Sequence, residues 1–568
     1  MAGIDYAIVA VFFVGIFAAG AYFYSWIGEA DDFFVAGRKL TPFILAATLT
    51  ATNVNLYSFV SQAGNANARG IGMIWQTWTG NMAMVLAGLF ILPVMRRLKI
   101  RTVPEFLEIR YGRSVRILTA AVIFLRLAFW LGIVVTIAVT VAQTVTRIDT
   151  VSIGSWQIDS WYFWVLVFAV ITVVYTVMGG MWSVALTDVL QFVLMMVGAL
   201  IVLPLIMKEI GWWPGLKESL PEGHLALVRS TGRFNWLFML SISILGIQWA
   251  STDQGLIQRA FGASSIKGLA KGMVLGGIIT TPFAFLWILP GLASRVFLFA
   301  RGIQVPVDQA IPTILPLILG PGLLGLILCG FLASQMSTLD SNLSAAATLF
   351  VNDIFGRFRR KPPSGKTLLK VVRIVTVIAG AFMVLFAYFI KDQSSTVDAY
   401  LWLIAILDMP LFVIVVVFGF FSRRATLPGA IIGYICGAVG GFITIWITAG
   451  EAALFAGNAS LATFVSAGAA VLGVVVGSMF GREPDPQQLD KVSDALRTSR
   501  EEQESGDEYH IWPVSFAGRV AATLVLVGFA VFLAGALAGR WDWQYAWVLA
   551  TGGMVTVFAA GLARLFFD

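Results

Sequence analysis

A stripe of hydroxyl groups with one carboxylate runs through an otherwise apolar stretch at residues 333–353. Its polar residues recur every three or four positions, which places them on one face of a helix: Ser334, Ser337, Thr338, Asp340, Ser341, Ser344 and Thr348. Such groups are costly inside a membrane unless they bind an ion or a solute. The stripe therefore predicts a helix that handles a cation.

A second group of polar residues interrupts the first long apolar hairpin. Residues 50–55 read Thr-Ala-Thr-Asn-Val-Asn in mid-span, and Asn and β-branched Thr weaken a helix there and free its carbonyl groups. Broken helices of transporters use such carbonyls for a coupling ion, although hydroxyl and amide groups also join helices to one another. Residues 248–254 predict a second break about 200 residues later, as an inverted repeat of five helices would require.

A third feature is Thr187-Asp188, with Gln191 one turn further on. A carboxylate in these apolar surroundings needs a partner. A bound cation is one candidate partner for Asp188, and a serine or backbone group near the cytoplasmic interface is the other.

The composition of the chain places these motifs in a membrane. Of its 568 residues, 58% are hydrophobic and 12% are charged, and the mean hydropathy is +0.86. These values exclude an ordinary soluble protein. The formal net charge of +7 comes from basic residues in short loops, so it indicates membrane orientation and no nucleic-acid partner. No phosphate-binding loop, metal-ligand spacing or catalytic constellation stands out, so we do not expect an enzyme.

About fifteen apolar runs are long enough to cross the membrane. They lie near 4–26, 42–64, 71–94, 117–146, 159–178, 183–207, 236–258, 273–299, 322–352, 371–391, 396–421, 427–449, 461–480, 516–538 and 543–563. Basic residues gather in alternate loops, at 96–101, 259–271, 357–366 and 423–424. By the positive-inside rule, the amino terminus is outside and the carboxyl terminus is cytoplasmic.

Several motifs in order resemble the sodium:solute symporter family, which includes carriers of glucose, proline and sialic acid. The resemblance runs from about residue 31 to residue 424, plus the preceding helix. The motifs that carry it are Asp32-Phe-Phe-Val-Ala-Gly-Arg38, Thr102-Val-Pro-Glu-Phe106, Gly179-Gly-Met with Thr187-Asp188 and Gln191, Thr252-Asp-Gln with Gln258-Arg259, and Met336-Ser-Thr-Leu339 followed by Asp353-Ile-Phe355.

The resemblance implies an all-α integral membrane protein with a LeuT-like core and alternating access driven by a sodium gradient. Two inverted repeats of five helices would lie at 31–210 and 236–424. Around them we expect a peripheral helix at 1–30, peripheral helices at 427–481, a solvated cytoplasmic linker at 482–515 that is partly helical from Asp490 to Glu504, and two C-terminal helices at 516–568.

The family's principal sodium site maps onto the carbonyl groups of Ala51 and Val54 and onto Ser334, Ser337 and Thr338. Hard oxygen ligands suit a small cation without its hydration shell. Some relatives bind a second sodium, for which the corresponding residues, besides Ser337, are Asp188, Asp340 and Ser341. Family members more often have a neutral residue at the position of Asp340, which leaves a stronger cation site, proton coupling or a local hydrogen bond open. We expect one or two sodium ions.

The similarity to glucose carriers retains Asn53 but replaces their other sugar contacts, with Thr77, Thr280, Leu401 and Trp249 at the aligned positions. A standard hexose site is therefore not implied. The predicted solute site comprises Thr52, Asn53, Gln76, Thr77, Trp249, Thr280 and Asp408. Trp249 could stack on the solute. Asp408 could recognise an amine or hydroxyl-rich solute, or could cap a helix break before Pro410.

Arg126 could bind a solute carboxylate, or its side chain could snorkel to the interface. We predict a symporter that imports a small polar organic solute with sodium, and we favour a sugar-like solute over an organic acid or an amino acid. A sodium-responsive sensor without concentrative transport is the alternative from another class. The expected partners are the solute and the lipid bilayer, in a prokaryotic inner membrane.

Overall fold

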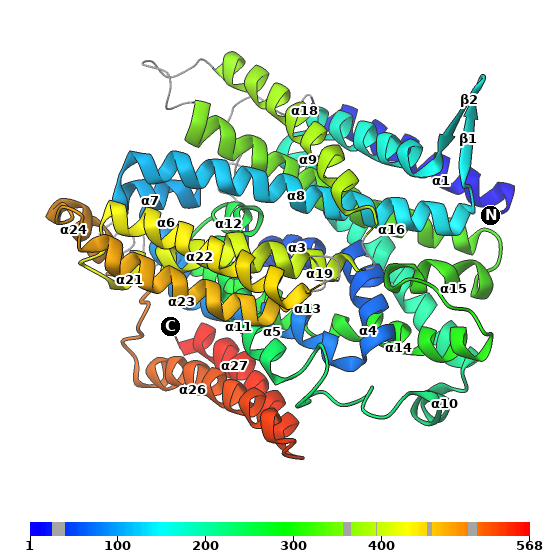
Figure 1. Ribbon diagram of the computed structural model, residues 1–568. Helices are drawn as coiled ribbons and strands as arrows, with labels where there is room; N and C mark the ends of the chain where they lie inside the picture. The colour runs from blue at the N-terminus through cyan, green and yellow to red at the C-terminus, as the bar shows by residue number, and fades with distance from the viewer. Residues whose placement is uncertain (25–39, 356–364, 393–394, 451–456, 498–507, 568) are drawn as a thin grey trace.

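The computed structural model describes the chain apart from residues 25–39, 356–364, 393–394, 451–456, 498–507 and 568, and describes no side chains at 16–17, 19–24, 153, 178–190, 365–366 and 369. The described chain is helical almost throughout (Figure 1). Its first part contains α1 (Gly3–Tyr24), α3 (Pro42–Asn53), η2 (Tyr57–Gln62), α4 (Ala63–Arg69), η3 (Ile71–Met73), α5 (Ile74–Leu86), η4 (Ala87–Ile91), α6 (Leu92–Arg97), α7 (Val103–Tyr111), α8 (Arg113–Thr146), β1 (Thr150–Ile153), β2 (Trp156–Asp159), α9 (Ser160–Glu209) and α10 (Trp212–Ser219).

The middle of the chain contains α11 (Trp236–Thr252), α12 (Gln254–Ala260), α13 (Ile266–Thr280), η5 (Pro282–Ala284), α14 (Phe285–Ala300), η6 (Val307–Gln309), α15 (Ala310–Ile318), α16 (Leu323–Leu349), η7 (Phe350–Phe355), α18 (Gly365–Ile390), α19 (Thr396–Leu403), η8 (Ile404–Asp408), α20 (Met409–Phe412), η9 (Val413–Val417) and α21 (Phe418–Phe421). The last part contains α22 (Leu427–Ala449), α23 (Ala459–Ser478), α24 (Pro486–Ala495), α26 (Phe516–Ala538), η11 (Gly539–Trp541) and α27 (Ala546–Phe567).

The number of membrane spans agrees with the sequence pattern when short and bent helices are included. In the described part of the chain, twelve helices are long and apolar enough to cross a membrane, and the bent pair α3 and η2–α4 makes a thirteenth. Our predicted spans 4–26 and 236–258 correspond to shorter apolar helices, Gly3–Gly15 and Trp236–Thr252. They account for the difference from about fifteen.

Both predicted helix breaks are present. Helix α3 begins at Pro42, with the Thr41 hydroxyl accepting the Ile44 amide at 3.3 Å, and ends where Val54 adopts an extended conformation (φ −93°, ψ 97°). The chain resumes as η2 and α4 after a bend of 47°. Asp253 separates α11 from α12 in the same way (φ −70°, ψ 119°), and its side chain accepts the Leu256 amide at 3.0 Å.

Two local features differ from the sequence-based expectation. Residues 159–178 and 183–207 were expected to be separate spans around a turn at Gly179-Gly180. Ser160–Val177 and Gln191–Glu209 are each long and apolar enough to cross a membrane, but the backbone between them stays helical instead of turning. The polar residues between α8 and α9 form a β-hairpin, whose strands β1 and β2 pair antiparallel around Gly154. Side chains that alternate over four residues suffice for such a ladder. In the part of the chain that the structure describes, the other regular elements are helices.

The predicted linker is docked rather than fully solvated in its described part. Its helix starts earlier than expected, at Pro486, and packs against α6 and α7 with Val492 only 4% exposed. Arg97 on α6 donates to the Ala495 carbonyl at 3.1 Å, and the Tyr509 hydroxyl donates to the Leu89 carbonyl at 2.8 Å. The linker therefore ties the hairpin of α26 and α27 to the core (Figure 1).

Candidate functional site

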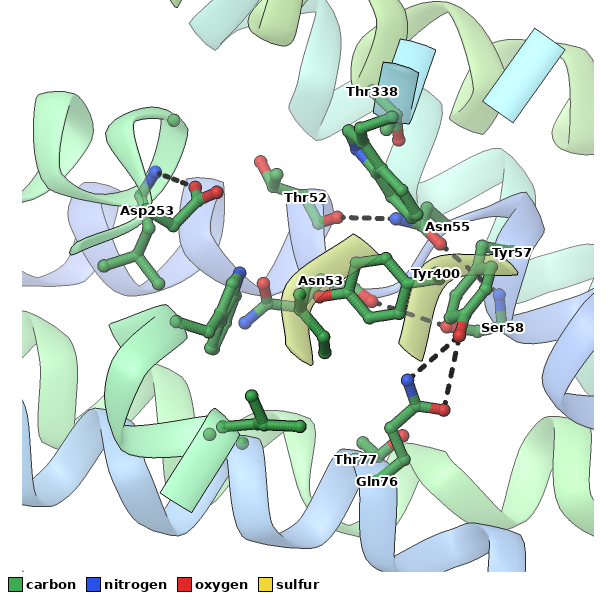
Figure 2. Close-up of a pocket in the computed structure, with 18 of the residues that line it drawn as sticks. Thr52, Asn53, Asn55, Tyr57, Ser58, Gln76, Thr77, Asp253, Thr338 and Tyr400 are labelled. Carbon is green, nitrogen blue, oxygen red and sulfur yellow. Dashed lines mark hydrogen bonds between the residues drawn. The ribbon is translucent and has the colours of Figure 1, made fainter. Parts of the chain in front are cut away.

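A cavity of about 150 Å³ lies between the two helix breaks (Figure 2). Its wall comes from α3, η2, α5, α8, α11, α12, α16, α19 and η8. The uncharged polar and aromatic residues of this wall carry amide groups, hydroxyl groups or aromatic rings: Thr52, Asn53, Asn55, Tyr57, Ser58, Gln62, Gln76, Thr77, Asn81, Trp130, Trp249, Thr338, Asn342 and Tyr400. The cavity also contains the charged groups of Arg126, Asp253 and Arg259.

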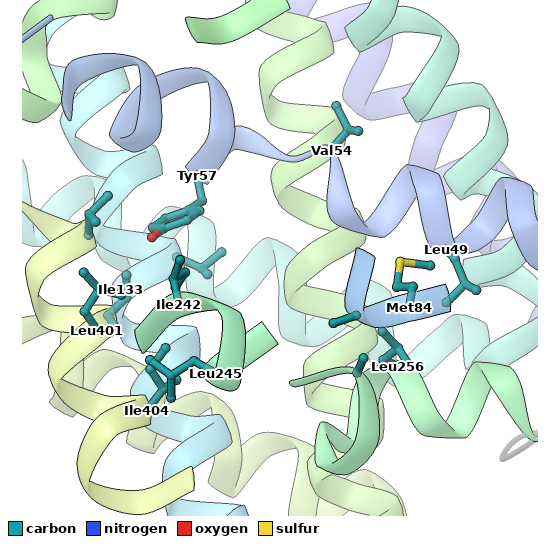
Figure 3. Close-up of a cluster of buried hydrophobic side chains, with 14 of the residues drawn as sticks. Leu49, Val54, Tyr57, Met84, Ile133, Ile242, Leu245, Leu256, Leu401 and Ile404 are labelled. Atoms are coloured by element: carbon teal, nitrogen blue, oxygen red, sulfur yellow. The ribbon is translucent and has the colours of Figure 1, made fainter. Parts of the chain in front are cut away.

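The break after α3 leaves particular carbonyl groups available. The carbonyl of Thr50 accepts the Val54 amide at 3.0 Å, and that of Thr52 accepts the Asn55 side-chain amide at 3.2 Å. The Ser58 hydroxyl approaches the Asn53 carbonyl at 3.5 Å. Because a helix end leaves its last carbonyls without helical donors, the Ala51 and Val54 carbonyls are suited to a cation. Buried apolar side chains flank this break, including Val54 and Leu49 (Figure 3).

Helix α16 brings the hydroxyl stripe against α3. Ser334, Ser337 and Thr338 are all buried, and Thr338 lies in the cavity wall. Thr338 donates its hydroxyl to the Ser334 carbonyl at 3.1 Å. The Ser334 hydroxyl has no hydrogen-bond partner among the described residues. A buried hydroxyl in this condition is available as a cation ligand.

Gln191 on α9 is a candidate ligand that sequence analysis did not assign. Helices α9 and α16 pack closely, with Ile327 facing Gly198 and Gly330 facing the Leu194 carbonyl. One further turn of this antiparallel register places Gln191 level with Ser334. Gln191 is 2% exposed, and in the described structure neither its amide oxygen nor its amide nitrogen has a hydrogen-bond partner. Its position one turn after Asp188 was the available sequence signal.

The residues predicted for a second cation are described only in part. The side chain of Asp188 and the whole Asp32–Arg38 motif lie outside the described residues. Asp340 and Ser341 are both buried on α16. The Ser341 hydroxyl accepts a hydrogen bond from the Arg259 guanidinium, which also donates to the Gly255 carbonyl at 3.1 Å. The positively charged Arg259 side chain therefore already contacts Ser341, one of the residues predicted for the second cation.

Five of the seven predicted solute residues line the cavity: Thr52, Asn53, Gln76, Thr77 and Trp249. The Gln76 amide donates to the Tyr57 hydroxyl at 2.9 Å (Figure 2), and the Thr77 hydroxyl donates to the side-chain Oε1 of Gln62 at 3.0 Å. These bonds hold the polar groups of α5 and η2 in fixed positions on one side of the cavity.

Thr280 and Asp408 are not in the cavity wall. Thr280 is fully buried, and its hydroxyl donates to the Gly276 carbonyl at 2.7 Å and lies 3.1 Å from the Thr50 hydroxyl. Asp408 is buried behind Arg126, at 3.4 Å from its Nε. Leu401, at the position of the glucose carriers' glutamine, belongs to the apolar cluster of Figure 3.

Arg126 does not snorkel to the interface. It is 4% exposed, and its Nη2 lies 2.6 Å from Asp253 Oδ2. Together with Asp408, the three residues form a buried group that links α8, the break after α11 and η8. Each of these three residues is more than a hundred residues from the next in the sequence, so no motif could predict that they lie together.

The comparisons with known proteins match this architecture. A family model described as "Sodium:solute symporter family" matches residues 33–437. The chain belongs to the sodium:solute symporter family. The symporter is 26% identical over 478 residues to the sodium/glucose cotransporter 4 of Mus musculus, covering 77% of this chain and 68% of the relative. It is also 26% identical to the sodium/myo-inositol cotransporter 2 of Oryctolagus cuniculus, covering 78% and 69% of the two chains.

Solved structures agree on the fold. A Na⁺-coupled sialic acid symporter in a substrate-bound outward-open state superposes with a TM-score of 0.73 at 20% identity, covering 85% of this chain and 99% of that one. The nucleobase-cation-symport-1 transporter Mhp1 in a closed conformation gives 0.53 at 14% identity, covering 82% and 98%. The symporter is thus a multi-pass membrane protein with a LeuT-like fold, a transporter rather than an enzyme, with sodium as coupling ion and a small solute as cargo.

Aromatic rings shape one end of the symporter's cavity. Tyr57 packs edge to face against Trp130 and Tyr400, with ring centroids 5.5 Å apart in both pairs, and Trp130 lies 4.8 Å from Tyr400. Trp249 stands on another side, near Gly80. Flat apolar faces next to hydroxyl and amide groups suit a solute with both CH and OH groups.

Proposed function

We propose that the symporter imports a small hydroxyl-rich solute, of sugar or sugar-derived type, together with sodium. The observation that carries this proposal is the cavity itself, which combines amide, hydroxyl and aromatic side chains next to Thr338 of the hydroxyl stripe. Directional hydrogen bonds to several hydroxyl groups need many fixed donors and acceptors, and rings such as Trp249 offer a face for the CH groups between them. The similarity to sodium/glucose and sodium/myo-inositol cotransporters supports the same solute class.

For sodium we propose a site formed by the carbonyls of Ala51 and Val54 with Ser334, Ser337 and Thr338. The break at Val54, the burial of all five residues and the Ser334 hydroxyl, which lacks a partner among the described side chains, support it. Gln191 would add an amide oxygen from α9. A second ion at Asp188, Asp340 and Ser341 is a separate part of the proposal. Because Arg259 already contacts Ser341, this second sodium ion would have to bind beside a guanidinium.

A site that joins α3, the break at Val54, α9 and α16 offers a direct means of coupling. Ligands before the break and at it would hold α3 against α16 when sodium binds, which favours one arrangement of the broken helix over the other. One sodium ion crossing a potential of 100 mV releases about 2.3 kcal/mol. Each tenfold sodium gradient adds about 1.4 kcal/mol. One ion is therefore sufficient to accumulate a neutral solute.

We further propose that residues 31–210 and 236–424 are the two repeats that move against each other, with the amino terminus outside and the carboxyl terminus cytoplasmic. The distribution of basic residues supports this orientation. The breaks at Val54 and Asp253 occur at corresponding places, after the first helix of each proposed repeat.

The test is a thermal-shift screen of the purified protein, followed by uptake into proteoliposomes. Sugars, polyols, sialic acids, amino acids and organic acids are each added in sodium and in potassium buffer. A sugar or polyol that stabilises only in sodium, and then accumulates against its gradient, supports the proposal through preferential binding to the folded state. Stabilisation by an organic or amino acid alone would contradict the solute class. Sodium-dependent binding without accumulation would favour a sensor.

A further inference from the structure

The cavity contains a permanent cation, Arg126, whose charge is already matched within the protein. Its Nη2 lies 2.6 Å from Asp253 Oδ2 and its Nε lies 3.4 Å from Asp408 Oδ1. All three side chains are at most 12% exposed. Nη2 of the guanidinium therefore already donates to one carboxylate, and a second carboxylate lies near its Nε.

The two carboxylates occupy different sides of the guanidinium. Arg126 and Asp253 both line the cavity, whereas Asp408 lies behind it. Asp253 is fixed in orientation, because its Oδ1 accepts the Leu256 amide at 3.0 Å while Oδ2 faces Arg126. Oδ2 of Asp253 thus occupies the guanidinium from the cavity side, where an acidic solute would approach it.

The formal charges around the cavity cancel. Arg126 and Arg259 contribute the positive charges of its wall, and Asp253 with the adjacent Asp408 contributes the negative ones. Arg259 in turn donates to Ser341 and to the Gly255 carbonyl. An anionic solute would therefore meet a matched guanidinium with the like charge of Asp253 beside it.

We propose that Asp253 is a specificity-determining residue that excludes anionic solutes by occupying Arg126 from the cavity side. This inference rests on the proposed function, and it narrows the solute to an uncharged one. Asp408 holds Arg126 from behind, so that the guanidinium stays in the wall rather than moving toward the solute.

The experiment compares the wild type with Asp253→Asn and Asp408→Asn. Asparagine retains the helix cap of α12 but removes the negative charge, and Asp408→Asn is the matched control because it leaves Asp253 in place. Acetate is the probe for a free guanidinium, and D-glucose with D-glucuronate is the solute pair. Binding is measured as thermal stabilisation in sodium.

Asp253→Asn should bind acetate where the wild type and Asp408→Asn do not, and should shift the glucuronate-to-glucose preference by about tenfold or more. Wild type that binds glucuronate as tightly as glucose would overturn the inference, as would Asp253→Asn without any gain for acetate. If that variant does not fold, the wild type still tests the inference, because it should bind neither acetate nor D-glucuronate. If neither D-glucose nor D-glucuronate binds but Asp253→Asn gains acetate binding, the proposed solute class is contradicted while the role of Asp253 is supported.

Discussion

Arg69 at the end of α4 donates to Asp398 at the start of α19, with 2.7 Å between Nη2 and Oδ2. Arg233, in the segment before α11, reaches the other oxygen of the same carboxylate at 2.9 Å. One buried carboxylate thus joins the second half of the broken helix to two other elements. Nearby, the Ser61 hydroxyl lies 2.6 Å from that of Thr396, which strengthens the same junction.

Asp398→Asn should loosen this junction and so admit solvent to the cavity, whose wall includes Tyr400 two residues further along α19. The substitution weakens two charge-assisted contacts whose arginine partners are a quarter exposed, so the expected loss is about 1 kcal/mol. In a Cys436→Ser background with Asn55→Cys in the cavity wall, an impermeant thiol reagent added outside should react about five times faster. Asp159→Asn, at an exposed cap of α9, is the control. Equal reaction rates would contradict a closing role for Asp398.

Ser334→Ala and Gln191→Leu should each raise the sodium concentration for half-maximal uptake by about tenfold, because each removes one oxygen ligand. Solute affinity at saturating sodium should stay unchanged. Ser466→Ala is the matched control, since its hydroxyl is buried and, within the described structure, equally lacks a partner, but belongs to α23. Unaltered sodium dependence in both variants would remove these residues from the ion site.

Asp340→Asn distinguishes a second ion from a structural role. If Asp340 helps to hold a second sodium, the variant should lose cooperativity in the sodium dependence of uptake while folding normally. The Hill coefficient is measured alongside the thermal midpoint. A preserved coefficient at normal stability would leave the principal site as the sole coupling site.

Trp249→Ala should weaken apparent solute affinity by about tenfold, because it removes an aromatic face from the cavity wall. Competition by unlabelled solute measures the effect. Trp446→Ala on α22, where the ring is largely exposed, controls for the loss of a tryptophan. A solute affinity equal to the wild type would exclude Trp249 from the binding site.

His224 should make the protein less stable in acid. Burial, with Arg229 and Arg295 nearby, lowers the pKa of His224 below its ordinary 6.5. The unfolded chain therefore binds a proton more readily than the folded one, and stability present above pH 6.5 is lost as the pH falls. The backbone of His224 accepts the Ile71 amide at 2.8 Å next to α4. Thermal midpoints from pH 8 to pH 5 should fall less in His224→Gln; parallel curves would contradict this origin.

Much of the architecture could be predicted because hydrophobic length and helix-weakening residues act locally. The break at Val54 follows from the Thr and Asn residues around it, and the break at Asp253 from the polar run before α12. The π-helical turn that ends at Asp408 lies just before Pro410, where the sequence allowed a helix break.

The residues missed at the site depend on contacts between distant helices. Gln191 became a candidate only once the register of α9 against α16 placed it beside Ser334. Arg126 looked free to bind a solute acid or reach the interface, because nothing near it in sequence indicates Asp253 or Asp408. Likewise, the charged linker conceals a small buried face at Val492 that only its packing against α7 reveals.

The β1–β2 hairpin projects beyond the neighbouring helices (Figure 1). At its turn, Gly154 has open space around it and Trp156 is 75% exposed. Residues placed there would disturb neither the core nor the cavity. The turn is thus a suitable insertion site for a short epitope after Gly154. Binding of an antibody to that epitope on intact cells would report which side of the membrane this end of the transporter faces.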